Sequence, residues 1–531
     1  MGKRVAAQKF GTGFERDLND PGYPLPEGII VEKDVPIEVR DGLKLAANVY
    51  RPDKPGKFPV IMSFTVYGKD LIGWGKKRFI PSHRISRETA FEAIDPGFWV
   101  PYDYVVILVD SRGFARSPGG AWTKYDYYDA IEWAGRQEWS DGNVGLSGVS
   151  YLAICQWDAA YLRPPHLKAI IPWEADSGQP TCKYGGIPET GFLKKLGELF
   201  LAPSYPAWGQ SFPEERPSGF QVLEPPGERI LEDITVPALI CATWSDQELH
   251  TRGGLWAYKT ISSEHKWLYT HGGEKWAEFY SSEALAIQKQ FFDRFLKNTD
   301  SRIMHMPRVR LEVRETLDKC RVRYEDDWPV PRTKYKKVYL DAETRTLNWH
   351  EVSRERKVTY GSANGRAVFD IKFDEDIELT GHMKLKLWVS PEDAEDMDLF
   401  VTLSKLNADG NEVYFTSWHA TSRYPVALGW LRLSWRKLDT QKSTPWQPIL
   451  KLDAEEKVKV GEVVPCEIEI YPSSTLFRTG ETLRLVISGK YEVESTRYVF
   501  DELSVNKGKH SILTGGKLDS YLLIPVVPPR I

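Results

Sequence analysis

The chain has 531 residues, too many for one ordinary hydrophobic core, so we expect two or three domains. A hydrophobic fraction of 41% and a charged fraction of 27% are typical of a soluble globular protein, and a net charge of -4 argues against nucleic-acid or membrane partners. The N-terminus lacks an apolar signal core, and the five cysteines are odd in number and widely separated. We therefore expect a cytoplasmic protein with reduced thiols.

The first predicted elements are a hairpin and the start of a parallel sheet. Residues 29–52 alternate between apolar and polar positions on either side of an Asp-Gly turn at Asp41 and Gly42. Residues 58–64 and 104–110 are continuous apolar runs, typical of strands buried on both faces. A helical pattern at 125–137 separates them from the next strand, which predicts a doubly wound α/β sheet.

The stretch 143–157, NVGLSGVSYLAICQW, predicts a nucleophile turn. It reads as a short strand, a sharp turn at Ser150 and then a helix, which would expose the serine hydroxyl in a strained conformation. Gly148 supplies the first glycine of the pattern G-x-S-x-G, whereas Leu152 stands in place of the second. Ser150 is therefore the candidate nucleophile.

Three further strands follow, and two of them end at polar residues. Residues 167–172 and 236–243 are apolar runs, the second ending just before Asp246, and 266–270 runs directly into His271. Between them, residues 173–232 lose their periodicity among Gly, Pro and aromatic residues, which predicts an inserted cap over the sheet edge where α/β folds place their sites. A helical pattern at 283–297 closes this region.

From about residue 307 short alternating strands replace the helical patterns, which predicts a C-terminal β-sandwich, a jelly roll in our interpretation. The predicted domains are an α/β-hydrolase catalytic domain at 1–172 and 233–306, a cap at 173–232 and the jelly roll at 307–531.

The three strand ends fit a catalytic triad in the α/β-hydrolase order of serine, acid and histidine. Ser150, Asp246 and His271 occur in that order, each just after a predicted buried strand. Asp246 could instead cap a helix. His250 and His265 compete with His271, which we favour because it alone directly follows the last strand.

An oxyanion hole needs two donors. One is the backbone N–H of Tyr151, which follows the nucleophile, and the other is the hydroxyl of Tyr67, in the loop after the 58–64 strand. The alternative for Tyr67 is that its ring only covers the core.

The same residues resemble the cocaine-esterase-like (CocE/NonD) hydrolases, which are allied to X-Pro dipeptidyl peptidases and α-amino-acid ester hydrolases. The resemblance covers nearly the whole chain and rests on segments 63–70, 104–119, 144–157, 237–247 and 396–410. It implies an α/β-hydrolase domain, a helical cap and a C-terminal jelly roll, with the triad Ser150, Asp246 and His271 and an oxyanion hole of Tyr67 and Tyr151. The family often has glycine where this chain has Ala153, and its histidine commonly follows a Gly-Pro-Trp turn that is absent here.

The resulting hypothesis is a serine hydrolase that cleaves a small acyl ester, or less favourably an amide, through an acyl-enzyme and without a metal or organic cofactor. One alternative is an X-Pro dipeptidyl or amino-acyl ester hydrolase, for which Glu174, Asp176 and Glu189 are available to hold a substrate amine. Another is an inactive carbohydrate-binding protein that uses aromatic residues of the sandwich, namely Trp388, Trp418 and Trp430. The natural substrate and the oligomeric state stay open, and a homo-oligomer is among the candidate states.

Overall fold

The computed structural model describes residues 22–71, 84–119, 123–177, 181–192, 231–418, 423–494 and 498–530. The chain divides into two compact units. The first comprises Met1–Gln179, Lys194–Thr243 and Gly253–Arg310, and the second Pro180–Leu193, Trp244–Arg252 and Leu311–Ile531. Most of the predicted cap, 173–232, lies outside the described residues, and the predicted domain limits stay predictions.

A mixed sheet forms the centre of the first unit. Its hairpin is β1 (Ile29–Glu38) and β2 (Lys44–Pro52), paired antiparallel as predicted, and β2 pairs antiparallel with β4. From β4 onward the neighbours are parallel, in the order β4–β3–β5–β6–β7–β8. These strands are β3 (Phe58–Thr65), β4 (Val105–Asp110), β5 (Ser140–Val149), β6 (Leu167–Trp173), β7 (Ala238–Thr243) and β8 (Lys266–His271). The predicted parallel sheet is therefore confirmed, and its carboxyl ends carry the candidate residues.

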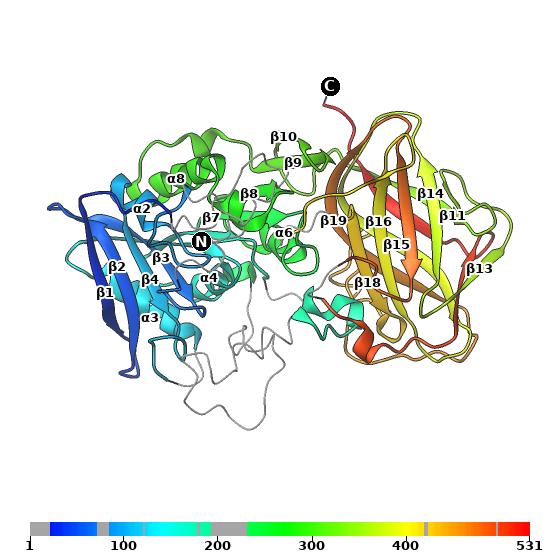
Figure 1. Cartoon of the computed structure of the whole chain (residues 1–531), viewed down its shortest axis with the longest axis horizontal. Coiled ribbons are helices and arrows are strands. Elements are labelled where there is room, and N and C mark those ends of the chain that lie inside the picture. The colour runs from blue at the N-terminus through cyan, green and yellow to red at the C-terminus, as the bar shows by residue number, and fades with distance from the viewer. Residues whose placement is uncertain are drawn as a thin grey trace, which may run out of the picture. The chain divides into compact units, whose positions relative to one another are not determined.

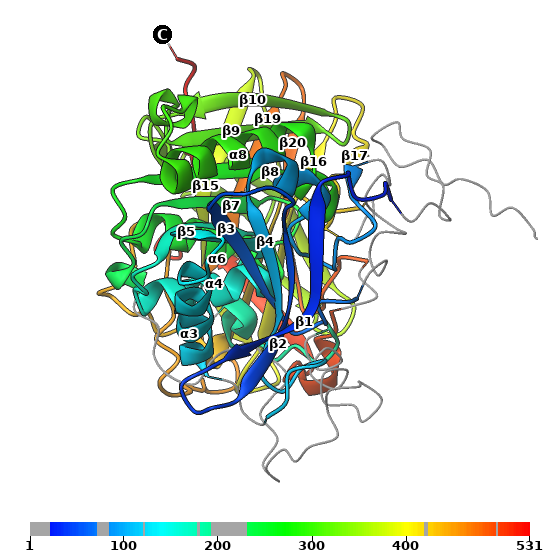
Figure 2. The same cartoon turned by 90° about the vertical axis from the view of Figure 1, so that its left-hand side faces the viewer.

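Helices cover both faces of this sheet. Figures 1 and 2 show α8 (Ser282–Lys297) on one side of the strands and α3 (Lys124–Gly135) with α4 (Tyr151–Tyr161) on the other. The α8 side is tightly packed, because a Cβ added at Gly145 of β5 would lie 2.7 Å from the Phe292 ring. Shorter helices are α2 (Pro96–Trp99), α6 (Thr251–Thr260) and α7 (Lys275–Phe279). Among the described residues no helix has the length and apolar character needed to cross a bilayer.

The second unit is rich in antiparallel strands, as predicted for the C-terminal region (Figure 1). One run of pairs is β11–β22–β15–β19 and another is β14–β20–β16–β18. The strands are β9 (Val309–Thr316), β10 (Lys319–Glu325), β11 (Lys334–Asp341), β12 (Thr346–Asn348), β13 (Arg356–Gly361), β14 (Arg366–Lys372), β15 (Ile377–Pro391), β16 (Asp398–Leu406), β17 (Glu412–Val413), β18 (Ala427–Arg432), β19 (Val464–Phe477), β20 (Thr482–Ser488), β21 (Lys509–Thr514) and β22 (Tyr521–Val526). The jelly-roll assignment stays a prediction.

A buried carboxylate ties several segments of the second unit together. Glu325, at the end of β10, accepts hydrogen bonds from Arg332 at 2.6 Å, from Arg323 at 2.5 Å and from Arg530 at 2.9 Å. Burial alone would raise the pKa of the Glu325 carboxyl, but the bonds from Arg332 and Arg323 outweigh it and lower the pKa to about 2. The cluster therefore depends on an ionised Glu325.

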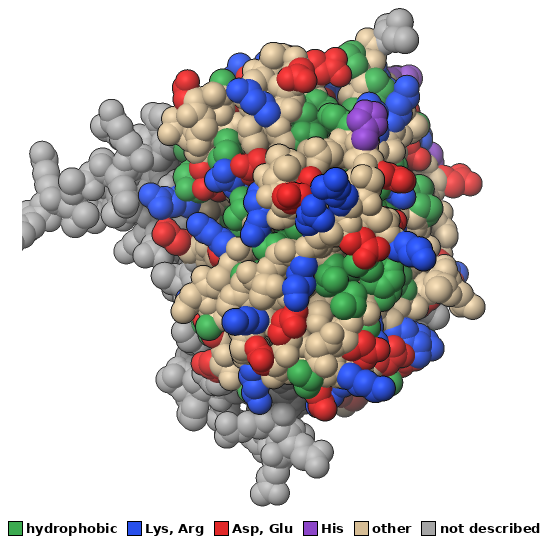
Figure 3. Space-filling view, turned by 90° about the vertical axis from the view of Figure 1, so that its right-hand side faces the viewer, with side chains coloured by type: hydrophobic (Ala, Val, Ile, Leu, Met, Phe, Trp, Pro, Cys, Tyr) green, Lys and Arg blue, Asp and Glu red, His purple; other side chains and the backbone are tan. Residues whose placement is uncertain are grey.

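One face of the second unit is mixed in charge. On the face drawn in Figure 3, Lys and Arg side chains are interspersed with Asp and Glu. The second unit also has exposed ion pairs, such as Arg356–Glu343 at 2.8 Å and Lys357–Glu392 at 3.1 Å. Such a surface presents no single-sign field on the face shown, in line with the small net charge.

Candidate active site

Ser150 occupies a strained turn between β5 and α4. Its backbone has φ 57° and ψ −117°, a left-handed conformation that residues with a side chain rarely adopt. Gly148 precedes it with φ 150°, and a Cβ at Gly148 would lie 2.6 Å from the Cβ of Leu152. The turn therefore has the backbone expected of an exposed nucleophile.

Hydrogen bonds on both sides hold this turn in place. The Val149 N–H donates to the Glu92 carbonyl at 3.0 Å, and the Ser150 N–H donates to the Trp173 carbonyl, also at 3.0 Å. The Ser150 carbonyl in turn accepts from Ile154 at 2.8 Å, in the first turn of α4. These bonds hold the strained conformation by fixing the backbone at Ser150 and at the residue before it.

Tyr151 is the first residue of α4, where the backbone N–H groups carry the positive end of the helix dipole. Its side chain is buried, and its hydroxyl lies 2.9 Å from the Tyr127 hydroxyl. Since the ring points into the core, the backbone N–H is the group through which Tyr151 could contact an oxyanion.

The Tyr67 hydroxyl interacts with two polar side chains, those of Ser150 and Glu92. Burial and the nearby Glu92 carboxyl raise the pKa of Tyr67 well above its ordinary value, whereas the hydrogen bond with Ser150 lowers it. The phenol therefore stays protonated and able to donate. The structure thus brings together Tyr67 and Ser150, two residues singled out from the sequence.

Asp110, at the end of β4, anchors the loop that carries Tyr67. Its Oδ1 accepts the Lys69 N–H at 2.6 Å and its Oδ2 accepts the Arg116 N–H at 3.1 Å. Burial raises the pKa of Asp110 to about 6 despite these bonds. Thr65 adds a second anchor, since its hydroxyl accepts the Tyr67 N–H at 2.9 Å. No pattern in the sequence indicated the supporting role of Asp110.

His271, the last residue of β8, is paired with a carboxylate. Its Nε2 lies 3.0 Å from Oε1 of Glu174, the residue that follows β6, and both side chains are fully buried. The imidazole stacks on the Trp173 ring with centroids 6.2 Å apart. Lys275 places its ammonium 3.9 Å from the other Glu174 oxygen. Glu174 therefore fixes the orientation of the predicted base.

Asp246 is paired with a different histidine. Its Oδ2 lies 2.8 Å from Nδ1 of His250, and its carbonyl accepts the N–H groups of His250 and Thr251 at 3.0 Å. Both side chains of the pair are buried in the second unit, whereas Ser150 and His271 belong to the first. A carboxylate on Nδ1 is the orientation that a catalytic triad uses, because it directs Nε2 outward as the base. The Ser150–His271–Asp246 relay stays a prediction.

The residues named for the peptidase and carbohydrate-binding alternatives are largely buried or already hydrogen-bonded to other groups of the protein. The Glu189 carboxylate accepts three backbone N–H groups at 2.6–2.9 Å, those of Gly191, Phe192 and Val499. Trp418 and Trp430 are each 4% exposed, and the Trp388 indole N–H donates to Asp519 at 3.3 Å. Neither buried ring has a face available for stacking on a sugar.

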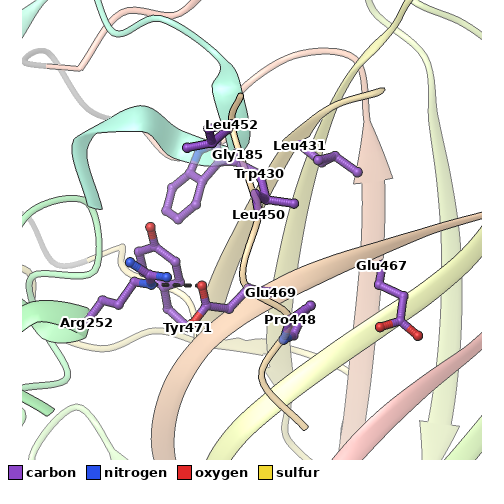
Figure 4. A pocket seen from close by; sticks show the side chains of 10 residues that line it. All are labelled: Gly185, Arg252, Trp430, Leu431, Pro448, Leu450, Leu452, Glu467, Glu469 and Tyr471. Atoms are coloured by element: carbon purple, nitrogen blue, oxygen red, sulfur yellow. Dashed lines mark hydrogen bonds and ion pairs between the residues drawn. The ribbon is translucent and has the colours of Figure 1, made fainter. Parts of the chain in front are cut away.

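A separate pocket lies in the second unit (Figure 4). Arg252 reaches into it and donates to Oε2 of Glu469 at 2.8 Å, beside the rings of Tyr471 and Trp430. The second Glu469 oxygen accepts from Gln447 at 2.9 Å. Because the charges of Arg252 and Glu469 offset each other, we assign the pocket no ligand.

Two family models match the chain. Residues 41–196 match the X-Pro dipeptidyl-peptidase (S15 family) model, and residues 301–523 match the X-Pro dipeptidyl-peptidase C-terminal non-catalytic domain. The S15 model covers the Ser150 turn, and the non-catalytic model covers most of the strand-rich unit.

Relatives that align over nearly the whole chain are also hydrolases. A solved CocE/NonD family hydrolase from Staphylococcus aureus is 41% identical, with a TM-score of 0.87 over 96% of this chain and 100% of that one. Cocaine esterase from Rhodococcus sp. (strain MB1 Bresler) is 25% identical over 94% of this chain and 98% of its own length. An α-amino acid ester hydrolase structure, 15% identical, shares the fold with a TM-score of 0.63 over 94% of this chain and 97% of its own. The chain therefore belongs to the CocE/NonD family of hydrolases.

Proposed function

We propose that this protein is a serine hydrolase that cleaves carboxylic esters through an acyl-enzyme on Ser150. The observation that carries the proposal is the strained Ser150 turn with the Tyr67 hydroxyl at the serine side chain. The name of the Rhodococcus relative, cocaine esterase, favours an ester over an amide.

In the proposed reaction, the Ser150 oxygen attacks the ester carbonyl while an imidazole takes its proton. The Tyr67 hydroxyl and the Tyr151 N–H donate to the oxyanion, the alcohol leaves with the proton from the imidazolium, and water then releases the acid by the same steps. These two donors act where charge develops, so they lower the barrier more than they tighten substrate binding.

The sequence assigns the proton transfer to His271, oriented by Asp246, and we retain this as a proposal. His250 is the second candidate, because Asp246 contacts its Nδ1 at 2.8 Å. Changing the base to alanine should reduce kcat by at least about 10³-fold, whereas changing the other histidine should cost far less. His250→Ala and His271→Ala, compared in kcat on one aryl ester after circular dichroism confirms folding, identify the base.

The nucleophile is tested by Ser150→Ala, which should abolish turnover of small aryl esters while leaving the circular dichroism spectrum intact. Ser147→Ala, in the same strand, is the matched control and should keep activity. A fluorophosphonate probe should label Ser150, mapped by mass spectrometry, in the parent protein and in Ser147→Ala but not in Ser150→Ala. Full activity in Ser150→Ala would remove the basis of the proposal.

Peptidase action is a second candidate because the S15 model covers residues 41–196. A dipeptidyl peptidase needs a carboxylate to hold the substrate amine, but Glu174 already contacts His271 and Lys275. We therefore expect p-nitrophenyl acetate to be cleaved faster than Ala-Pro p-nitroanilide. Preference for the anilide would reverse the assignment.

A further inference from the structure

The segment that carries Asp246 packs with the strand-rich second unit, although elements of the first unit flank it in the chain. This segment, Trp244–Arg252, which we call the acid loop, directly follows β7, and its last residues begin α6. Asp246 lies near its start and is fully buried. The proposed catalytic acid is therefore held in the unit that the non-catalytic family model mostly covers, whereas Ser150 belongs to the first unit.

The two residues before Asp246 are hydrogen-bonded to the second unit. The Trp244 indole N–H donates to the Glu312 carbonyl of β9 at 2.9 Å. The Ser245 carbonyl accepts the Trp418 N–H, also at 2.9 Å. These bonds fix the path by which the chain reaches Asp246.

Gln247, the residue after Asp246, is fully buried and uses both polar atoms of its side-chain amide. Its Nε2 donates to the Val426 carbonyl at 3.0 Å, and its Oε1 accepts the Leu428 N–H at 2.6 Å. Val426 directly precedes β18 and Leu428 lies in it, so the amide pairs with this strand as a backbone peptide group would. Because one planar peptide unit joins Gln247 to Asp246, this pairing also restricts where the Asp246 carboxylate can lie.

Tyr424 adds a second connection between the acid loop and the strands. Its hydroxyl accepts the Gln247 N–H at 2.9 Å and donates to the Glu248 carboxylate. The Tyr491 hydroxyl donates to the other Glu248 oxygen at 2.5 Å, and the Tyr184 hydroxyl donates to the Glu248 carbonyl at 2.8 Å. The two residues that follow the proposed acid are therefore both held by side chains of the second unit.

We propose that Gln247 is a positioning residue, through which the second unit fixes the Asp246 carboxylate for the proton transfer at Ser150. This inference rests on the proposed serine-hydrolase function and deepens it. It applies to either candidate base, since Asp246 orients the imidazole in both cases. Gln247 acts through Asp246 and not on the substrate, because its amide is engaged with Val426 and Leu428.

The test measures kcat and KM for p-nitrophenyl acetate in Gln247→Met, which keeps the side-chain length but removes both amide bonds. Displacing a catalytic group by about 1 Å costs about 10²-fold in rate, so kcat should fall about 10- to 100-fold with KM within about twofold. In an Asp246→Ala background, adding Gln247→Met should leave kcat unchanged, because no carboxylate remains to be positioned.

Asn506→Leu is the matched control in the second unit. The Asn506 amide also bridges backbone groups, since its Nδ2 donates to the Gly489 carbonyl at 2.7 Å and its Oδ1 accepts the Asp398 N–H at 2.7 Å. These partners lie outside the acid loop, so kcat should stay within about twofold of the parent.

The inference is overturned by an unchanged kcat in folded Gln247→Met, by an equal loss when Asp246 is already alanine, or by the same loss in the control. If Gln247→Met does not fold, Tyr424→Phe decides the matter: it should lower kcat about tenfold in the parent and not in Asp246→Ala, and any other result overturns the inference. Fluorophosphonate labelling of Ser150 in the parent separates the two levels. Without labelling the proposed function fails too, and with it only the role of Gln247 is in question.

Discussion

Replacing Ser150 by glycine should stabilise the protein while destroying activity. Ser150 has φ 57° and ψ −117°, a conformation that costs a residue with a Cβ about 1–3 kcal/mol. Glycine adopts positive φ without this penalty. The proper reference is Ser150→Ala, which also lacks the hydroxyl but keeps the Cβ.

The magnitude follows from two opposing contributions. Glycine relieves about 1–3 kcal/mol of strain but loses about 0.5–1 kcal/mol through the greater freedom of the unfolded chain. Ser150→Gly should thus exceed Ser150→Ala in stability by up to about 2.5 kcal/mol, or a few degrees in Tm. Ser147, which lies in β5 and is not among the residues with positive φ, should show the opposite sign, with glycine about 0.5–1 kcal/mol below alanine.

Differential scanning calorimetry of the four variants, following the transition of the first unit, measures these differences. Circular dichroism and esterase assays accompany each sample, and all position-150 variants should be inactive. The reasoning is refuted if glycine lies below alanine at position 150 by as much as it does at position 147, because the turn would then store no strain.

Three further outcomes are expected. Tyr67→Phe should reduce kcat about 10²-fold with little change in KM, measured on an aryl ester, and an unchanged kcat would remove Tyr67 from the oxyanion hole. Gly148→Ala should destabilise the first unit by about 2–4 kcal/mol in urea unfolding, because its Cβ would meet Leu152 at 2.6 Å; a neutral effect would contradict this packing. Glu325→Gln should cost about 2 kcal/mol at pH 7 after allowance for screening. Since the folded pKa of Glu325 lies at about 2, below its ordinary 4.5, this difference should be full above pH 4.5 and fade as pH falls toward 2; a difference that does not change with pH would exclude the charge as its source.

The sequence was informative wherever backbone pattern decides the structure. Continuous apolar runs marked β3, β4 and β7, and the Gly148–Ser150 turn was recognisable because few other local structures combine a strand, a sharp turn and a helix. α7, five residues long, was not predicted, because so short a segment has too few residues to establish a helical period.

Side-chain pairing could not be derived in the same way. Sequence order linked Asp246 to His271, but the observed neighbours are His250 for Asp246 and Glu174 for His271. Which carboxylate reaches which imidazole depends on rotamers and loop paths that order along the chain does not specify. Gln247 was missed for a related reason, since its pairing with Val426 and Leu428 is set by tertiary packing alone.

The crowding between positions 148 and 152 also constrains how this chain can change. The Gly148–Ser150 turn has room for the Cβ of Leu152 only because Gly148 has no Cβ of its own. A methyl group at 148 meets this contact until residue 152 has shrunk to glycine and stays strained at φ 150° even then, so the effects of the two substitutions depend on each other. A search pattern that requires glycine at both positions would overlook this sequence, although the turn satisfies the same spatial requirement with one.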